Sequence, residues 1–309
     1  MTISIISHPD CALHEMGAHH PESPARLSAI QDQLLSSGLD FVLQHYDAPP
    51  ASREQLCRVH DPKYVEHIFN IFIKTPEEDR VWLDPDTCIN QYSLSAALHA
   101  AGAVVLGVDL VMSGQTQAAF CNIRPPGHHA ERKKAMGFCI FNNIAVGAAH
   151  AKEMYHLKRI AIVDFDVHHG NGTEDIFREM PEILLCSTFQ HPFYPFTGSN
   201  VVSDHIVNVP LPAGTGGKAF RAAVQSHWLP KLEIFQPELI LISAGFDAHI
   251  EDEMADLCLV EQDFAWVTSE IKTIADKYAK GRIISTLEGG YNLSGLGRSA
   301  VAHLDALLG

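Results

Sequence analysis

Short apolar runs alternate with longer amphipathic or Ala-rich segments along this chain of 309 residues. Apolar runs of strand length, bounded by polar residues or glycine, are typical of parallel strands buried on both faces. We predict such strands at 3–6, 41–45, 118–121, 160–163, 183–186, 206–209, 239–243 and 282–286. We predict helices at 24–35, 62–72, 92–112, 143–154, 173–178, 218–235, 261–278 and 296–308. The alternation indicates an α/β fold with a central, mostly parallel sheet.

Capping and breaking residues refine this assignment. Ser52 followed by Gln55 is typical of a capping box at the start of a short helix. Pro230 predicts an interruption of the helix in which it lies. Residues 74–90 show neither the period of a helix nor that of a strand, and they are predicted to be a loop. We find no linker, repeat or low-complexity segment, so the sequence predicts a single domain, 1–309.

Four predicted strands end in unusual polar sequence. In an open α/β sheet the ligand site lies beyond the carboxyl ends of the strands. Four such endings are better explained by one shared site than by four coincidences. The motifs are R-P-P-G-H-H (124–129), D-F-D-V-H-H-G (164–170), S-A-G-F-D-A (243–248) and L-E-G-G-Y (287–291).

Two of these motifs offer metal ligands. Side chains alternate along extended backbone, so Asp164, Asp166 and His168 are expected to point to one side. Asp247, at another strand end, is the expected third ligand. Asp166, His168 and Asp247 would hold one zinc ion and leave an open position for water, as catalytic zinc sites do. The simpler alternatives are a polar exit loop and, for Asp247, a helix-capping carboxylate. The cost of desolvating so many polar groups without a role argues against the first.

The other two motifs offer acid–base groups and a hydroxyl. Adjacent His128 and His129 suit proton transfer near neutral pH. Tyr291 follows two glycines and is a candidate donor to a developing oxyanion. The pairs Gly137-Phe138 and Phe193-Tyr194 are candidate walls for an extended aliphatic substrate. Ordinary packing is the alternative for each, and for the aromatics it is the commoner case.

Composition excludes several classes of protein. The net charge of −15 disfavours nucleic-acid binding, which needs clustered Lys and Arg. Seven cysteines without a C-x-x-C pair favour reduced thiols and a cytoplasmic location. The N-terminus lacks a signal-peptide pattern. The most apolar stretch, 96–112, contains His99 and Asp109, and we interpret it as a buried helix rather than a membrane span.

The motifs together resemble the zinc-dependent histone deacetylase and acetylpolyamine amidohydrolase superfamily, most closely its bacterial, class II-like branch. They follow the order that the family has and span nearly the whole chain. The resemblance implies the three-layer α/β/α arginase/deacetylase fold. The blocks that carry it are H-P-E-S-P-A-R-L (20–27), V-H-D-P-K-Y (59–64), R-P-P-G-H-H-A (124–130), M-G-F-C-I-F-N-N (136–143), V-D-F-D-V-H-H-G-N-G-T (163–173), F-Y-P-F-T-G (193–198), S-A-G-F-D-A (243–248) and L-E-G-G-Y (287–291).

The resemblance also implies metal ligands. It matches Asp166, His168 and Asp247 to the zinc ligands of the family. It further implies a buried, structural potassium ion near the same strand ends. The potassium ligands implied are the side chains of Asp164 and Ser187 with the carbonyls of Asp166, His168 and Thr188.

The resemblance implies roles for the remaining site residues. His128 and His129 match the tandem catalytic histidines, Tyr291 matches the tyrosine that holds the substrate carbonyl, and Asp164 matches the carboxylate behind the first histidine. The implied substrate-binding residues are Gly137, Phe138, Tyr194, Arg26 and Met254, with Arg26 near an internal product channel.

Two positions depart from the family pattern. Asn171 stands where some members have an aspartate behind the second histidine, and an amide cannot stabilise an imidazolium as a carboxylate does. His129 is therefore expected to be the neutral member of the pair and the base. Phe196 stands where relatives often have glycine, which leaves the shape of the rim open.

The expected reaction is hydrolysis of an N-acyl amide, most simply acetyl-lysine in a peptide or protein. An acetylated polyamine is the alternative substrate, because acidic residues at 251–256 could form a cation-attracting rim, although a solvated loop is the simpler interpretation. The non-enzymatic alternative is a silent acyl-lysine binder, which the intact ligand set argues against. The two-metal arginase pattern is not present in these motifs. Neither a nucleic acid nor a membrane is an expected partner, and the oligomeric state stays open.

Overall fold

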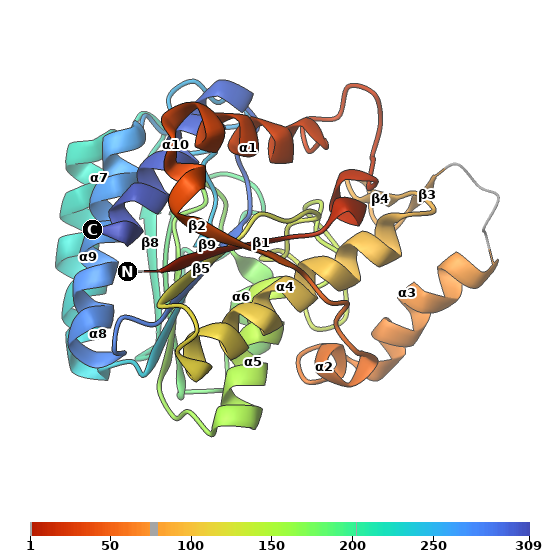
Figure 1. Cartoon of the computed structure of the whole chain (residues 1–309), viewed down its shortest axis with the longest axis horizontal. Helices are drawn as coiled ribbons and strands as arrows, with labels where there is room; N and C mark the ends of the chain where they lie inside the picture. Colours follow the sequence, from red (N-terminus) through yellow and green to blue (C-terminus); the bar gives the residue numbers. More distant parts are fainter. Residues whose placement is uncertain (1, 75–79, 202) are drawn as a thin grey trace.

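The computed structural model describes residues 2–74, 80–201 and 203–309, without the side chains of 72–74. One eight-stranded sheet runs through the centre, in the order β2-β1-β5-β10-β9-β6-β7-β8 (Figure 1). Every neighbouring pair of strands is parallel, which confirms the predicted fold class. The strands are β1 (Ile3–Ser7), β2 (Leu43–Asp47), β5 (Ala118–Cys121), β6 (Ile160–Asp164), β7 (Ile183–Gln190), β8 (Ile206–Leu211), β9 (Leu239–Ala244) and β10 (Ile283–Leu287).

Helices cover both faces of the sheet. One apolar core lies between the sheet and α2 to α6, and another lies between the sheet and α1 with α7 to α10. Figure 1 shows α7, α8 and α9 side by side, away from α4 and α5. The helices are α1 (Ala25–Ser37), α2 (Arg53–Cys57), α3 (Pro62–Lys74), α4 (Ser93–Ser113), α5 (Asn143–Tyr155), α6 (Asn171–Phe177), α7 (Gly217–Ala223), α8 (Leu229–Phe235), α9 (Glu261–Tyr278) and α10 (Leu293–Leu308).

The apolar helix α4 is a core element. By length and composition it is the one helix, among the described residues, that could cross a bilayer, yet 67% of its most apolar window is buried inside the protein. Its alanines and valines pack against the sheet and against α5. A helix that is apolar on most of its faces is expected in such a position.

Some predicted boundaries were wrong. Part of the loop predicted at 74–90 forms a two-stranded antiparallel sheet, β3 (Val81–Trp82) and β4 (Cys88–Ile89), while 75–79 lie outside the described residues. Two-residue strands are too short to show a period in the sequence. The break predicted at Pro230 comes earlier, as a π-helical turn (Val224–Trp228). Pro230 itself lies in the first turn of α8, which continues directly from this π-helical turn.

The helix starts are set by side-chain caps. Ser52 and Gln55 form the predicted capping box, with Gln55 N–H donating to Ser52 Oγ at 3.2 Å and Ser52 N–H to Gln55 Oε1 at 2.8 Å. The last helix begins at Leu293, three positions before the predicted 296, because Asn292 Oδ1 accepts the Gly295 N–H at 2.8 Å. Both caps accept hydrogen bonds from backbone N–H groups that the start of a helix leaves without a partner.

Parallel pairing brings the polar motifs to one edge of the sheet. Asp164 at the end of β6 pairs with Ser187 on β7 and with Ser243 on β9. Leu287 on β10 pairs with Ala244 on β9. The chain segments that follow these strand ends therefore leave the sheet side by side, as the sequence predicts.

We predict that buried histidines make the fold acid-sensitive. His303 on α10 is enclosed by Phe120, Phe165 and Phe246, and burial lowers its pKa to about 3. The unfolded state therefore binds a proton below pH ~6.5 that the folded state does not bind. Between pH 7 and pH 5 this group should lower the free energy of unfolding by about 2 kcal/mol.

Urea unfolding of the wild type and of His303→Gln at both pH values checks this. Glutamine keeps polar atoms near Thr268 and Ser285, which bond the imidazole at 2.6 and 2.9 Å. Between pH 7 and pH 5 the free energy of unfolding should fall by about 2 kcal/mol less in the variant than in the wild type. An equal fall in the free energy of unfolding for both proteins would show that His303 does not stay neutral in the folded state.

Candidate active site

The three predicted metal ligands meet beyond the ends of β6 and β9. Asp166, His168 and Asp247 are buried, and their ligand atoms lie within 4.8 Å of one another. His168 Nδ1 lies 3.1 Å from Asp166 Oδ1 and 3.1 Å from Asp247 Oδ2. Backbone N–H groups of Val167 and Gly289 hold the other carboxylate oxygens at 3.0 and 2.8 Å. Two carboxylates and one imidazole in this arrangement form a donor set for a divalent ion.

Charge in this cluster is strongly coupled. Burial and the neighbouring Asp166 raise the pKa of Asp247 to about 6. Burial disfavours the charged form of His168, but its hydrogen bonds to Asp166 and Asp247 outweigh that effect and raise its pKa to about 10. The two carboxylates therefore need a positive charge between them, which either a proton or a metal ion can supply.

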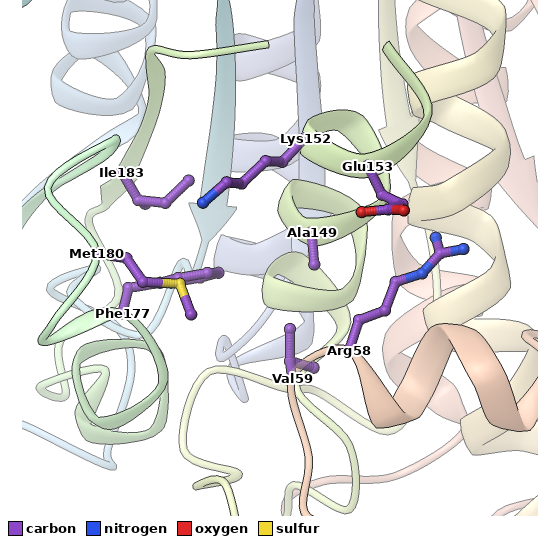
Figure 2. Close-up of a pocket in the computed structure, with 8 residues that line it drawn as sticks. All are labelled: Arg58, Val59, Ala149, Lys152, Glu153, Phe177, Met180 and Ile183. Atoms are coloured by element: carbon purple, nitrogen blue, oxygen red, sulfur yellow. The ribbon is translucent and has the colours of Figure 1, made fainter. Parts of the chain in front are cut away.

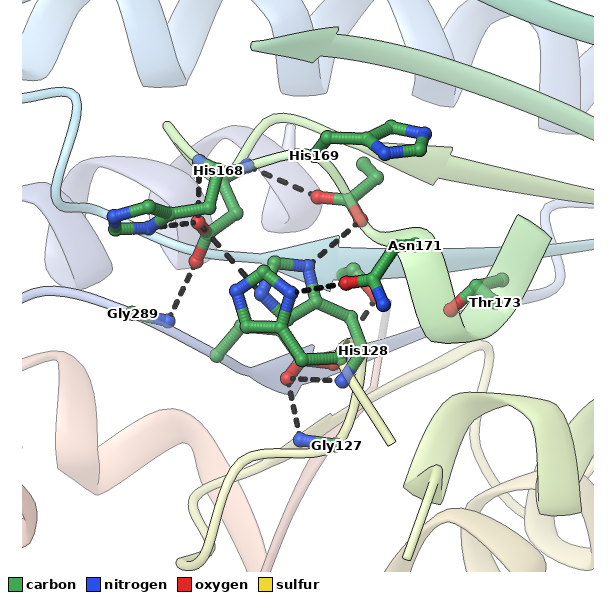
Figure 3. Close-up of polar contacts among 12 residues, drawn as sticks. Gly127, His128, His168, His169, Asn171, Thr173 and Gly289 are labelled. Carbon is green, nitrogen blue, oxygen red and sulfur yellow. Dashed lines mark hydrogen bonds and ion pairs between the residues drawn. The ribbon is translucent and has the colours of Figure 1, made fainter. Parts of the chain in front are cut away.

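Gly245 and Gly289 leave space for the carboxylates of Asp166 and Asp247. A Cβ on Gly245 would clash with the Asp166 carboxylate, and one on Gly289 would clash with the carboxylates of Asp247 and Asp166. Gly289 also donates its N–H to Asp166, as Figure 3 shows. The motifs S-A-G-F-D-A and L-E-G-G-Y thus need glycine here because the backbone passes close to the acidic groups.

The tandem histidines have different partners. His128 Nδ1 lies 3.0 Å from Asp164 Oδ2, whereas His129 Nδ1 lies 2.7 Å from Asn171 Oδ1 (Figure 3). Burial opposes charge on both rings. Asp166 and Asp164 nevertheless raise the pKa of His128 well above its usual value, whereas burial, His128 and His168 lower that of His129 well below. The structure therefore pairs one charged and one neutral imidazole.

Asn171 also fixes the tautomer of His129. Its Nδ2 donates to Glu131 Oε1 at 2.8 Å, so the amide oxygen is the atom that faces His129. A carbonyl oxygen accepts, and His129 Nδ1 must then carry the proton. The lone pair of the neutral ring is therefore on Nε2.

Glu288 is an anchor that sequence reasoning did not assign. Its Oε2 accepts the N–H groups of Gly127 and His128 at 2.7 and 3.1 Å, and its Oε1 accepts the Ser243 hydroxyl at 3.1 Å. The carboxyl is fully buried, and burial raises its pKa to about 7. It joins the end of β10 to the loop that carries the tandem histidines, 161 positions earlier in the chain.

An apolar pocket of about 200 Å³ leads to this cluster. Predicted wall residues Phe138, Tyr194, Gly137 and Met254 all line it, and so do Tyr291, His129 and His168. Phe193, predicted with Tyr194 as an apolar wall, lines the pocket too, and its ring stacks on that of His168 with the centroids 5.6 Å apart. The lining also includes Asp86, which sequence reasoning missed.

The segment before α4 supports the pocket wall. Asp86 Oδ1 accepts the Gly137 N–H at 3.1 Å, and Thr87 Oγ1 accepts the Phe138 N–H at 3.0 Å. These contacts hold a backbone with φ of 57° at Gly137 and 67° at Phe138, in the left-handed region. A Cβ on Gly137 would also clash with the His129 ring. In the sequence, the only indication of this contact is D-P-D-T (84–87), which is typical of a turn.

Tyr291 and Arg26 contact each other beside the Glu288–Gly290 segment. Asp252 accepts the Tyr291 N–H at 2.6 Å, and burial raises the pKa of the Tyr291 hydroxyl well above its usual value. The Arg26 guanidinium lies 5.0 Å from the Tyr291 ring centroid and donates to the carbonyls of Gly290 and Glu288. Arg26 therefore contacts this segment, in addition to forming an ion pair with Glu22.

Two of the predicted potassium ligands, Asp164 and Ser187, lie side by side. Asp164 and Ser187 are paired across β6 and β7. Ser187 Oγ is buried and has no hydrogen-bond partner in the described structure. An unsatisfied buried hydroxyl beside a carboxylate fits a cation that takes oxygen ligands.

The rim differs from the expectation of a free acidic patch. Asp252 is buried and bonded to backbone, Glu251 lies 2.9 Å from Arg298, and Asp256 accepts from Gln190. Phe196 is 72% exposed with φ of 63°, a conformation that glycine adopts without strain.

A second pocket, of about 250 Å³, lies elsewhere in the fold (Figure 2). Its walls come from α5, from the ends of α2 and α6 and from the start of β7, and it shares no lining residue with the first pocket. Its two basic residues, Arg58 and Lys152, are already paired with Glu54 and Glu182. It carries no metal-ligand cluster among the described residues, and the first pocket is therefore the candidate active site.

Comparisons with known proteins agree with this geometry. A sequence model described as histone deacetylase domain matches residues 20–307. A histone deacetylase-like amidohydrolase of Pseudomonas aeruginosa is 36% identical over 94% of this chain and 78% of that protein. The polyamine deacetylase HDAC10 of Homo sapiens is 37% identical over 93% of this chain and 44% of that protein. The crystal structure of an HDA15 HD domain matches with a TM-score of 0.91 and 34% identity, over 99% of this chain and 88% of that one.

We predict that Glu288→Leu destabilises the protein far more than Glu288→Gln. Leucine leaves the buried N–H groups of Gly127 and His128 without an acceptor, which should lower the free energy of unfolding by on the order of 3 kcal/mol. Glutamine keeps an acceptor oxygen in the same place. Urea unfolding of both variants at one pH measures the difference. Equal stability of the two variants would show that these hydrogen bonds do not anchor the loop.

Proposed function

This chain belongs to the histone deacetylase family and is a deacetylase, and we propose that its substrate is Nε-acetyl-lysine in peptides or proteins. The observation that carries the proposal is the pocket of about 200 Å³, whose walls are largely aromatic or apolar and whose inner residues include His129 and His168. Such a pocket fits an unbranched aliphatic chain that presents an acyl amide to polar groups. The products are acetate and the free amine.

We propose one zinc ion at Asp166, His168 and Asp247. Their buried donor set and their coupled charges support it, and so do the glycines that leave space beside the carboxylates. When bound there, zinc would polarise the amide carbonyl and make a water molecule acidic near neutral pH. For potassium, the support is Asp164 beside the unsatisfied Ser187 hydroxyl, with the carbonyls of Asp166, His168 and Thr188 completing the proposed set.

The proposed reaction uses the asymmetry of the histidines. His129, neutral with its lone pair on Nε2, takes a proton from the attacking water. The Tyr291 hydroxyl, kept protonated by its raised pKa, donates to the oxyanion that forms from the carbonyl. The C–N bond then breaks, and a protonated histidine gives its proton to the amine. His128 is the histidine whose surroundings favour charge, because Asp164 and Asp166 face it.

An acetylated polyamine is the second candidate substrate. Asp86 in the pocket lining and exposed Glu253 in the adjoining cavity could attract a cation, and one relative is named a polyamine deacetylase. The pairing of Glu251, Asp252 and Asp256 within the protein weighs against a rim built for cations. A lysine side chain brings no second amine into the pocket and needs no such rim.

Turnover of three substrate classes by zinc-loaded protein tests the proposal. These are an acetyl-lysine peptide, longer acyl-lysine peptides and acetylated polyamines at equal concentration. The proposal expects the highest kcat/KM for the acetyl-lysine peptide. A higher kcat/KM for an acetylated polyamine would overturn the substrate assignment and leave the deacetylase activity intact.

We predict that Tyr291→Phe removes most turnover and leaves KM nearly unchanged. The hydroxyl is needed mainly in the transition state, and losing one such donor lowers kcat by on the order of 10²–10³. Steady-state kinetics of zinc-loaded variant and wild type measure the effect. A variant within about threefold of wild type would mean that Tyr291 only packs against Phe138 and Arg26.

We predict that Asn171→Asp moves the acidic limb of the pH–rate profile to higher pH. A carboxylate at 2.7 Å favours the imidazolium, so the pKa of His129 rises and the neutral base is lost at a higher pH than before. Glu131 would face the new carboxylate, because it now accepts from the Asn171 amide. Glu131→Gln is therefore combined with Asn171→Asp and is also tested alone.

The double variant and Glu131→Gln alone separate the effect on His129 from the effect of Glu131. The double variant should show the shift fully, and Glu131→Gln alone should leave the limb near its wild-type position. A limb that stays in place, or moves to lower pH, in the double variant would mean that His129 is not the titrating base. Because neighbouring groups titrate together, the measured shift belongs to the site as a whole.

A further inference from the structure

A second cluster of metal-ligand side chains lies outside the active site. It consists of His8, just after β1, Asp10 in a short 3-10 helix (Pro9–Ala12) and His99 on α4. One ligand atom from each lies within 4.8 Å of the other two, and all three residues are half-buried. None of them lines the active-site pocket, and the reaction proposed above does not use them.

The distances between the Asp10 carboxylate and the two imidazoles are too long for hydrogen bonds. Asp10 Oδ1 lies 3.8 Å from His8 Nδ1, and Asp10 Oδ2 lies 4.0 Å from His99 Nε2. Two atoms that bind one zinc ion at ~2.1 Å and a tetrahedral angle lie roughly 3.4 Å apart. The carboxylate is thus placed between two imidazoles at nearly the spacing of shared coordination, without bonding directly to either.

Neighbouring groups orient two of the three side chains. His99 Nδ1 lies 2.7 Å from the Ala48 carbonyl, which can only accept, so Nδ1 carries the proton and the lone pair is on Nε2. Asp10 Oδ2 accepts from the Ser95 hydroxyl. A carbonyl behind a histidine and a donor behind a carboxylate are the usual outer partners of metal ligands.

His8 completes the set. Its Nδ1 accepts the Asp10 N–H at 3.2 Å, a long bond that an ion could replace. Its ring stacks on the His99 ring, with centroids 3.4 Å apart and planes 3° from parallel. An ion lies near the plane of each imidazole that binds it, so one ring must turn on binding. His8 is the more exposed ring, at 22% against 13% for His99.

We propose that His8, Asp10 and His99 form a second binding site for a divalent ion of the zinc class, separate from the active site. Two imidazoles and a carboxylate suit zinc, cobalt or nickel better than magnesium or calcium, which prefer all-oxygen sites. The ion would join the 3-10 helix to α4. The 3-10 helix contains Cys11, whose carbonyl accepts from the Arg124 guanidinium at 2.9 Å. Arg124 directly precedes the loop that carries the tandem histidines. The site therefore stabilises the segment that supports this loop.

Zinc binding to an Asp247→Ala background tests the proposal. Removing Asp247 disables the active-site cluster, so that any remaining stoichiometric zinc belongs elsewhere. Metal-free protein is titrated with zinc chloride, bound zinc is measured by equilibrium dialysis and elemental analysis, and thermal unfolding is followed with and without zinc. On this background we add His99→Ala or His8→Ala, with His67→Ala as the matched control, because His67 is an exposed imidazole on α3 outside the cluster.

We expect the Asp247→Ala protein and its His67→Ala derivative to bind one zinc ion per chain and to unfold at a higher temperature with zinc. Adding either His99→Ala or His8→Ala should remove both effects. His8 is partly exposed, so its variant reports on the site even if His99→Ala impairs folding. The absence of saturable zinc binding in Asp247→Ala, or its retention in a folded His8→Ala derivative, would overturn the proposal. Such a result would assign the cluster to a stacked imidazole pair without a metal.

Discussion

The structure depends on burying several carboxylates at one edge of a parallel sheet. Asp164, Asp166, Asp247 and Glu288 are almost completely buried there. Isolated buried charge of this kind is strongly unfavourable, so each carboxylate needs donors or a cation. Backbone N–H groups supply part of what is needed: Gly289 donates to Asp166, Val167 to Asp247, and Gly127 to Glu288. The remaining charge is balanced by histidines and by the cations that we propose.

This constraint explains both the fold around the site and its chemistry. Parallel register places the strand ends together, and glycines at 245 and 289 let the chain pass beside the carboxylates. The same carboxylates make the two neighbouring histidines unequal. Asp166 and Asp164 favour charge on His128, whereas burial, His128 and His168 disfavour it on His129, whose partner is an amide and not a carboxylate. One acid and one base thus arise from two adjacent residues of the same type because their partners differ.

The strands of the central sheet and most helices were predictable because each has a clear apolar run, an apolar period or a cap. The site was predictable to the extent that its residues cluster in short motifs, as Asp166 and His168 do. Contacts between distant segments were not: Glu288 bonds the Gly127 backbone across the sheet, and Asp86 bonds the Gly137 backbone from a loop without periodicity. A buried carboxylate that accepts backbone N–H groups leaves no local pattern in the sequence. Its role becomes visible only when the fold brings its donors within reach.

The central claim is that the buried carboxylates of the active site are arranged around a zinc ion. A crystal structure of zinc-loaded, catalytically active protein, with anomalous data collected on both sides of the zinc absorption edge, tests it most directly. The account predicts an anomalous peak ~2.0–2.2 Å from Asp166, His168 and Asp247. An active crystal with no peak between these three residues, and with His168 still hydrogen-bonded to both carboxylates, would contradict it.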